Sequence, residues 1–121
     1  MDEFYAPELA LYELHRYEPL LLKKSKLTKQ ELDDIVTRLQ NHVTFMPWTF
    51  YQHAIPTVLH DLQHSTQQEL QELLDDIDFL ALAVTLHCPL WSRDRLLKQQ
   101  SIVQVFTTSD VVSYKKNKRK N

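Results

Sequence analysis

The chain of 121 residues contains no glycine, although average usage of about 7% would give roughly eight. This absence excludes the chemistries that need a glycine turn, which include the phosphate-binding P-loop, the dinucleotide fingerprint, the EF-hand loop and the nucleophile elbow. There is also one cysteine, Cys88. A single cysteine excludes an internal disulfide and a multi-cysteine zinc site, and it fits a reducing compartment.

Long hydrophobic runs are absent as well. The longest apolar stretch, residues 79–86, is far shorter than the roughly 20 residues that span a bilayer. The first residues, Met1-Asp2-Glu3, are acidic and so resemble no signal or transit peptide. We therefore predict a cytoplasmic protein with no membrane segment. The composition is 43% hydrophobic and 25% charged, which suffices for one packed core, and we predict a single domain over residues 1–114.

Basic residues are concentrated at the C-terminal end. Five of the fourteen Lys and Arg residues lie in residues 115–121, so the rest of the chain has nine basic residues against sixteen acidic ones and a net charge of −7. We predict that residues 115–121 form a disordered basic tail. Such a tail can also contact phosphates by counterion release.

Short apolar runs alternate with segments of helical periodicity, a pattern typical of an α/β domain with a mostly parallel sheet. Strands are predicted at residues 4–6, 43–45, 88–92 and 102–106. Polar residues that follow such strands are candidates for a ligand site, because ligands bind beyond the carboxyl ends of parallel strands.

The predicted helices are marked by caps and prolines. The first helix follows Pro7 and breaks near Pro19, and two more begin at the capping boxes Thr28/Glu31 and Thr66/Glu69. A helix is predicted over residues 48–63 with a kink at Pro56, and another over residues 77–86 with Asp76 as its N-cap. Short helices are predicted over residues 95–99 and from the cap Ser109 to Tyr114.

Three carboxylates, Glu13, Asp76 and Asp94, lie in three successive strand and helix units. They could converge at one end of the sheet, where cations would relieve their mutual repulsion. Oxygen ligands alone favour Mg²⁺ or Mn²⁺. Each also has a structural interpretation: Asp76 as a helix cap, Asp94 as a turn residue and Glu13 as a solvated helix residue.

Two blocks of sequence carry a family resemblance. Residues 76–83, followed by Pro89-Leu90-Trp91-Ser92-Arg93-Asp94, resemble the C-terminal signature of PIN-domain ribonucleases, especially the toxin subunits of VapBC toxin–antitoxin systems. Residues 5–14 are similar to the region where that family places a helix-borne glutamate, and residues 105–108 resemble its last strand. The similarity extends from about Phe4 to Tyr114 and implies a three-layer α/β/α PIN-like domain.

The resemblance also implies an activity and a site. Glu13, Asp76 and Asp94 correspond to three of the four metal-binding acids of the family, and Ser92 corresponds to the small polar residue that orients the last of them. The family's first acid, on an N-terminal strand, has no counterpart, so the domain is expected to be N-terminally truncated and weakly active or inactive.

The implied reaction is Mg²⁺-dependent (or Mn²⁺-dependent) hydrolysis of RNA phosphodiesters. Arg93, Arg95 and Lys98 are then the expected RNA contacts. The implied partners are an antitoxin protein and a second copy of the chain.

Three alternatives compete with this interpretation. His53, His60 and His64 could present three imidazoles to zinc or nickel, although Pro56 interrupts their register and scattered surface histidines are favoured. The helix pair around residues 7–40 could make the chain a non-catalytic dimerisation or antitoxin-binding module. A nucleophilic Ser92 or Cys88 is disfavoured, because neither has a histidine at a spacing that indicates a paired base; His87 merely adjoins Cys88.

Overall fold

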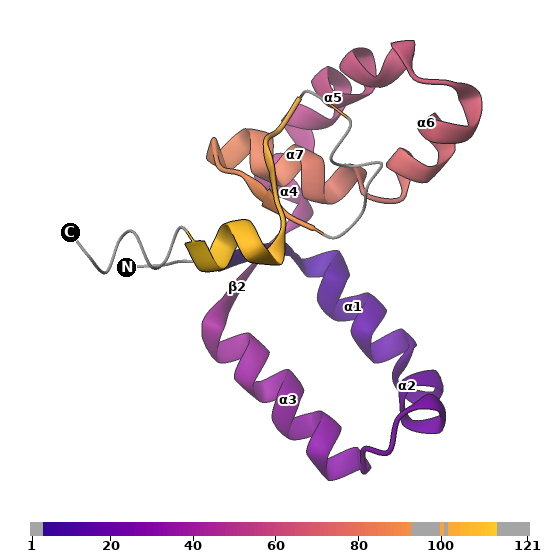
Figure 1. The fold of residues 1–121 in the computed structure, drawn as a ribbon, viewed down its shortest axis with the longest axis vertical. Helices are drawn as coiled ribbons and strands as arrows, with labels where there is room; N and C mark the ends of the chain where they lie inside the picture. The colour runs from indigo at the N-terminus through magenta and orange to yellow at the C-terminus, as the bar shows by residue number, and fades with distance from the viewer. Residues whose placement is uncertain (1–3, 93–99, 101, 114–121) are drawn as a thin grey trace, which may run out of the picture. The chain divides into compact units, whose positions relative to one another are not determined.

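The computed structural model describes residues 4–92, 100 and 102–113. It divides into two compact units, residues 1–48 and 49–121 (Figure 1). The helix predicted at 95–99 and the basic tail predicted at 115–121 lie outside the described residues.

The first unit is a crossover between two parallel strands. Its elements are β1 (Phe4–Pro7), α1 (Glu8–Arg16), α2 (Glu18–Lys24), α3 (Lys29–His42) and β2 (Val43–Met46). The strands pair from Phe4 opposite Val43 to Pro7 opposite Met46. Both predicted strands are confirmed, and their parallel pairing follows from the helical connection, which is long enough to return the chain to the same end.

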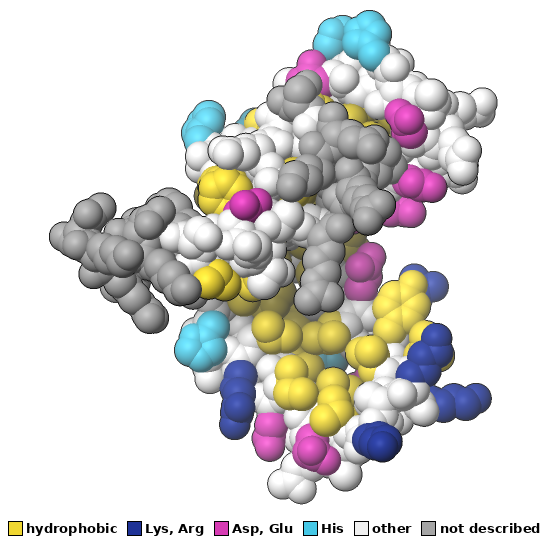
Figure 2. Space-filling view, in the orientation of Figure 1, with side chains coloured by type: hydrophobic (Ala, Val, Ile, Leu, Met, Phe, Trp, Pro, Cys, Tyr) yellow, Lys and Arg dark blue, Asp and Glu magenta, His cyan; other side chains and the backbone are white. Residues whose placement is uncertain are grey.

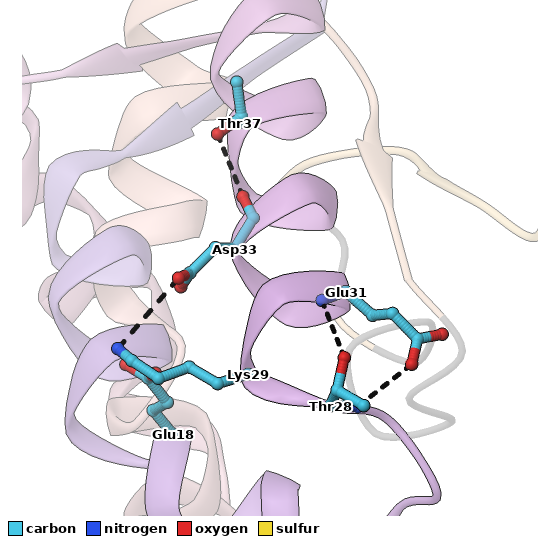
Figure 3. A network of polar contacts seen from close by, with 6 residues as sticks. All are labelled: Glu18, Thr28, Lys29, Glu31, Asp33 and Thr37. Carbon is cyan, nitrogen blue, oxygen red and sulfur yellow. Dashed lines mark hydrogen bonds and ion pairs between the residues drawn. The ribbon is translucent and has the colours of Figure 1, made fainter.

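Local sequence sets the helix boundaries of this unit. Helix α1 ends at Arg16, and α2 begins at Glu18 after one intervening residue. Pro19 lies in the first turn of α2, where a backbone N–H would have no partner within the helix, so its absence in proline costs nothing. The predicted break near Pro19 is therefore confirmed. The Thr28/Glu31 capping box is also confirmed, since the Glu31 amide donates to the Thr28 hydroxyl and the Thr28 amide donates to the Glu31 carboxylate, each at 3.1 Å (Figure 3).

The second unit contains α4 (Trp48–Tyr51), which begins at its boundary, η1 (Gln52–Ala54), α5 (Ile55–Asp61), η2 (Leu62–His64), α6 (Gln67–Leu74), α7 (Ile77–Leu86), β3 (Leu90–Trp91), β4 (Val105–Phe106) and a helix over 108–113. The continuous helix predicted over 48–63 is wrong, because 3₁₀ turns interrupt it. Pro56 lies in the first turn of α5 and kinks nothing.

Helix α7 is the centre of the second core. Four consecutive residues, Leu80 to Ala83, are buried, so the predicted buried helix is confirmed. Buried side chains of Tyr51, Ala54, Val58 and Leu62 recur at helical spacing along α4 to η2. The 3₁₀ turns thus alter the backbone but keep one apolar side of this segment in the core.

The α/β class is confirmed, in a mostly helical form. The strands pair in parallel as two small sheets, β1 with β2 and β3 with β4. Strands β3 and β4 are shorter than predicted, because the backbone groups of the residues before each strand make hydrogen bonds elsewhere. Before β3, the amides of His87 and Cys88 bond to carbonyls at the end of α7, and Pro89 has no amide to donate.

The Gln100 side chain shortens β4. Its Oε1 accepts the amides of Ile102 at 2.8 Å and Val103 at 3.0 Å, and its Nε2 donates to the Val103 carbonyl at 2.6 Å. These backbone groups close a local turn and are not available to a strand. Pairing therefore begins only when Leu90 donates to the Gln104 carbonyl, at 2.8 Å.

Across the described residues, no helix combines the length and apolar character needed to cross a membrane.

Candidate functional site

Glu13 lies on α1, the helix that directly follows β1, and its side chain is exposed. Leu9, Tyr12, Glu13 and Arg16 recur at i, i+3, i+4 and i+7 and share one face of the helix. All four are exposed. The carboxylate predicted to bind metal is therefore presented outward, between aromatic and basic neighbours.

Asp76 occupies the turn between α6 and α7, and it is half-buried. Its backbone is at φ −107° and ψ 12°, outside the extended region that directs a capping side chain toward the helix. Asp76 is the N-cap residue of α7, as predicted, and its carbonyl accepts the Leu80 amide at 3.1 Å, but within the described chain its carboxylate makes no capping hydrogen bond.

Ser92 marks the carboxyl end of β3. Its amide donates to the Phe106 carbonyl at 3.0 Å, so the β3–β4 pairing continues to the residue just before Arg93-Asp94. Thr107 follows β4 at the same end, and Trp91 donates from its indole nitrogen to the Thr108 hydroxyl at 3.2 Å. The described residues thus place hydroxyl groups where the parallel strands end, the position expected for a ligand site.

Asp94 and the predicted RNA contacts Arg93, Arg95 and Lys98 lie outside the described residues. Glu13 belongs to the first unit and Asp76 to the second. Among the residues that the structure describes, no three His, Cys, Asp or Glu side chains form a metal-binding group. The convergence of Glu13, Asp76 and Asp94 stays a prediction; as a donor set, three carboxylates match the hard cations Mg²⁺ and Mn²⁺.

The alternative zinc or nickel site is not formed. His53 lies in η1, His60 in α5 and His64 in η2, and all three are exposed. No metal-binding group in the described ranges includes them.

Cys88 and His87 adjoin a surface cavity of about 320 Å³, also lined by Val84, Pro89 and Ile102. Burial raises the pKa of the Cys88 thiol. A raised pKa lowers the thiolate fraction at neutral pH, and the thiolate is the nucleophilic form. The structure therefore gives no support to Cys88 as a catalytic nucleophile.

Charge is distributed unevenly between the units (Figure 2). The described part of the second unit contains seven Asp and Glu residues and no Lys or Arg. All six described Lys and Arg residues belong to the first unit, between Arg16 and Arg38. The phosphate contacts predicted from sequence all lie in the C-terminal half, and this basic group in the first unit was not predicted. The run Lys23-Lys24-Ser25-Lys26 is the sequence feature that could have indicated it.

A family model described as PIN domain matches residues 2–114, so one model covers both compact units. No curated protein and no solved structure matched the chain.

Proposed function

Because the chain belongs to the PIN domain family, we propose that it is a Mg²⁺-dependent endoribonuclease of the toxin–antitoxin type that hydrolyses RNA phosphodiesters. The family match over residues 2–114 is the observation that carries this proposal. PIN domains are generally divalent-metal-dependent nucleases that act on RNA.

The proposed site consists of Glu13, Asp76 and Asp94, with Ser92 orienting Asp94. The three carboxylates hold Mg²⁺ or Mn²⁺, which when bound lowers the pKa of a water and neutralises charge that grows on the phosphate oxygens. No protein nucleophile is needed. Three carboxylates hold a divalent cation less strongly than four, so we expect weak metal affinity and slow turnover from this chain.

Arg93, Arg95 and Lys98 complete the proposed site as phosphate contacts beside Asp94. The described part of the second unit has acidic residues and no Lys or Arg, so it repels RNA away from these contacts. In the same proposal, the chain is cytoplasmic, forms a homodimer and is silenced by an antitoxin protein.

The direct test is cleavage of a fluorescent single-stranded RNA by the purified full chain, with Mg²⁺, with Mn²⁺ and with EDTA. Asp94→Asn should abolish the metal-dependent cleavage, because it removes a charged ligand while keeping the shape of the side chain. Asp75→Asn is the matched control, an exposed neighbour of Asp76 assigned no ligand role. If Asp94→Asn cleaves as fast as the parent chain, the nuclease proposal fails.

A second candidate function is a non-catalytic binding or dimerisation module built on the helices around residues 7–40. One observation favours it: the first unit leaves large apolar side chains in solvent (Figure 2). Leu20 and Leu21 on α2 are 46% and 37% exposed, and Ile35 and Leu39 on α3 are 42% and 40% exposed. Ile35 and Leu39 are four residues apart and share one side of the helix.

Metal titration separates this candidate from the nuclease, because both proposals include a dimer and only the nuclease needs a divalent cation. Association tests the apolar surface itself. Ile35→Glu with Leu39→Glu should shift light scattering toward monomer, because two buried carboxylates would oppose the interface. Gln30→Glu with Gln40→Glu adds the same charge on other faces of α3 and should leave association unchanged. A clean monomer at high micromolar concentration in the parent chain, without added partner, would contradict a dimerisation role.

A further inference from the structure

A short basic segment lies on the first unit and is not used by the proposed metal site. Residues 16–29 contain five Lys and Arg residues and one acidic residue, Glu18. That acid is occupied, because Lys29 Nζ lies 3.4 Å from Glu18 Oε1 and 4.0 Å from Asp33 Oδ2 (Figure 3). Within the described ranges, no carboxylate lies within ion-pair distance of the exposed Lys23, Lys24 and Lys26.

Charge alone does not decide what this segment does. Lys23 and Lys24 form the last turn of α2, where cations stabilise a helix by interacting with its dipole. Such lysines are common on solvated helices that bind nothing. A ligand is indicated only if a second, different feature of the same surface also fits it.

Exposed aromatic rings provide that second feature. Tyr12 is 76% exposed and Tyr17 is 49% exposed, on α1 and at its end. The guanidinium carbon of Arg16 lies 5.9 Å from the centre of the Tyr17 ring, within the range of a cation–π contact. Aromatic rings beside unpaired cations are the arrangement that binds single-stranded nucleic acid, since bases stack on the rings and cations contact phosphates.

We propose that this surface binds single-stranded RNA. The α1–α2 strip, as we name it, consists of Tyr12, Arg16, Tyr17, Lys23, Lys24 and Lys26. Bases stack on the two tyrosines, and the lysines contact phosphates of the same strand. Stacking requires unpaired bases, so the ligand is a single strand and not a duplex.

The strip lies beside Glu13, one of the carboxylates of the proposed metal site. Glu13 adjoins Tyr12 and precedes Tyr17 by four residues, so a strand stacked on both rings runs past a carboxylate assigned to the metal. This inference rests on the proposed nuclease function and adds the path of its substrate.

The tyrosines are tested by fluorescence anisotropy of a labelled uridine 12-mer titrated with the full chain in EDTA, where metal-dependent cleavage is blocked. Tyr12→Ala and Tyr17→Ala should each weaken binding about five-fold or more, the effect of losing one stacked base. Tyr12→Phe and Tyr17→Phe keep the rings and should bind as the parent does. Circular dichroism of each variant checks that α1 is intact.

The lysines are tested by the salt dependence of the same binding. Lys23→Gln, Lys24→Gln and Lys26→Gln together should reduce the slope of log affinity against log salt by about two, since each phosphate contact on a single strand contributes about 0.7.

The matched control for the lysine variant makes the same change of net charge on another surface. Gln67→Glu, Gln68→Glu and Gln71→Glu alter exposed residues of α6 in the second unit. This control variant should keep the parent slope. If the slope of log affinity against log salt falls equally in both variants, net charge alone determines binding, and the proposal that the strip binds RNA is wrong.

The outcomes separate the strip from the nuclease proposal. If the parent chain binds and cleaves RNA while the alanine and glutamine variants bind as it does, the strip is wrong and the nuclease stands. If Tyr12→Ala changes the oligomeric state but not RNA affinity, the surface is a protein interface and the strip is again wrong. If Asp94→Asn binds RNA as the parent does without cleaving it, and Tyr17→Ala binds it weakly, both proposals hold.

Discussion

The backbone amide of Cys88 donates a hydrogen bond to the carbonyl of Ala83 at 3.1 Å, five residues earlier in the chain. Inside this loop, the His87 amide donates to the Val84 carbonyl at 3.2 Å, and His87 has left-handed angles, φ 54° and ψ 46°. These bonds form a Schellman motif, the ending of a helix that usually places glycine at the left-handed residue. In a chain with no glycine, histidine takes that position.

His87→Gly should stabilise the fold. A residue with a Cβ is less stable by about 1–2 kcal/mol in the left-handed region, and the greater freedom of glycine in the unfolded chain offsets part of the gain. We expect the free energy of unfolding in urea to rise by about 0.5–1 kcal/mol. Gln71→Gly, within α6, should lower it by about 1 kcal/mol. Equal losses in both variants would contradict a left-handed His87.

Thr107, and not the predicted Ser109, caps the last described helix. The Asp110 amide donates to the Thr107 hydroxyl at 3.2 Å, and the Thr107 amide donates to the Asp110 carboxylate at 2.8 Å. Thr107→Ala should therefore lower the free energy of unfolding by about 1 kcal/mol. Ser109→Ala should change it by less than about 0.5 kcal/mol. Thermal unfolding followed by circular dichroism ranks the two variants, and the reverse order would contradict this capping box.

Gln100 holds the turn before β4 through three hydrogen bonds to backbone groups. Gln100→Ala leaves two partly buried amides and a carbonyl without that partner, so the free energy of unfolding should fall by about 1–3 kcal/mol. Gln104→Ala removes the same type of side chain from an exposed position and should cost less than about 0.5 kcal/mol. Urea denaturation of the two variants makes the comparison, and similar stabilities would show that the turn does not depend on Gln100.

Cys88 should alkylate slowly. Its pKa is raised by burial, so at any pH near neutral the native thiol is ionised less than a free thiol, whose pKa is about 8.5. The rate of reaction with iodoacetamide should reach half its maximum at a higher pH in the native protein than in urea. Because Cys88 is the one cysteine of the chain, mass spectrometry reads the reaction directly. A native profile at or below the denatured one would contradict the raised pKa.

The features predicted correctly from sequence are those that few neighbouring residues decide. The capping boxes at Thr28 and Thr66 need only a partner three positions on, and both form. The buried helix over 77–86 follows from the mostly apolar run at residues 79–86. The break near Pro19 follows from the missing N–H of proline, which is tolerated in the first turn of α2 but cannot continue α1.

The features that sequence did not predict depend on backbone geometry or on distant segments. A glutamine has no local pattern that marks it as the partner of two later amides, so the role of Gln100 and the short β4 were missed. Asp76 is the N-cap residue but lacks the dihedral angles that direct a capping side chain toward the helix. The convergence of Glu13, Asp76 and Asp94 stays a prediction, because it depends on how segments far apart in sequence are placed, which local pattern does not encode.

The uneven placement of lysine and arginine also determines how the chain can be cut. Trypsin cleaves after these residues, and none occurs from residue 39 through residue 92. A complete digest therefore releases residues 39–93 as one long peptide that carries β2 and the helical core around α7, while residues 17–38 fall into short fragments. Peptide mapping of this protein, including any search for a modification on α5, α6 or α7, consequently requires a protease that cleaves at acidic or aromatic residues.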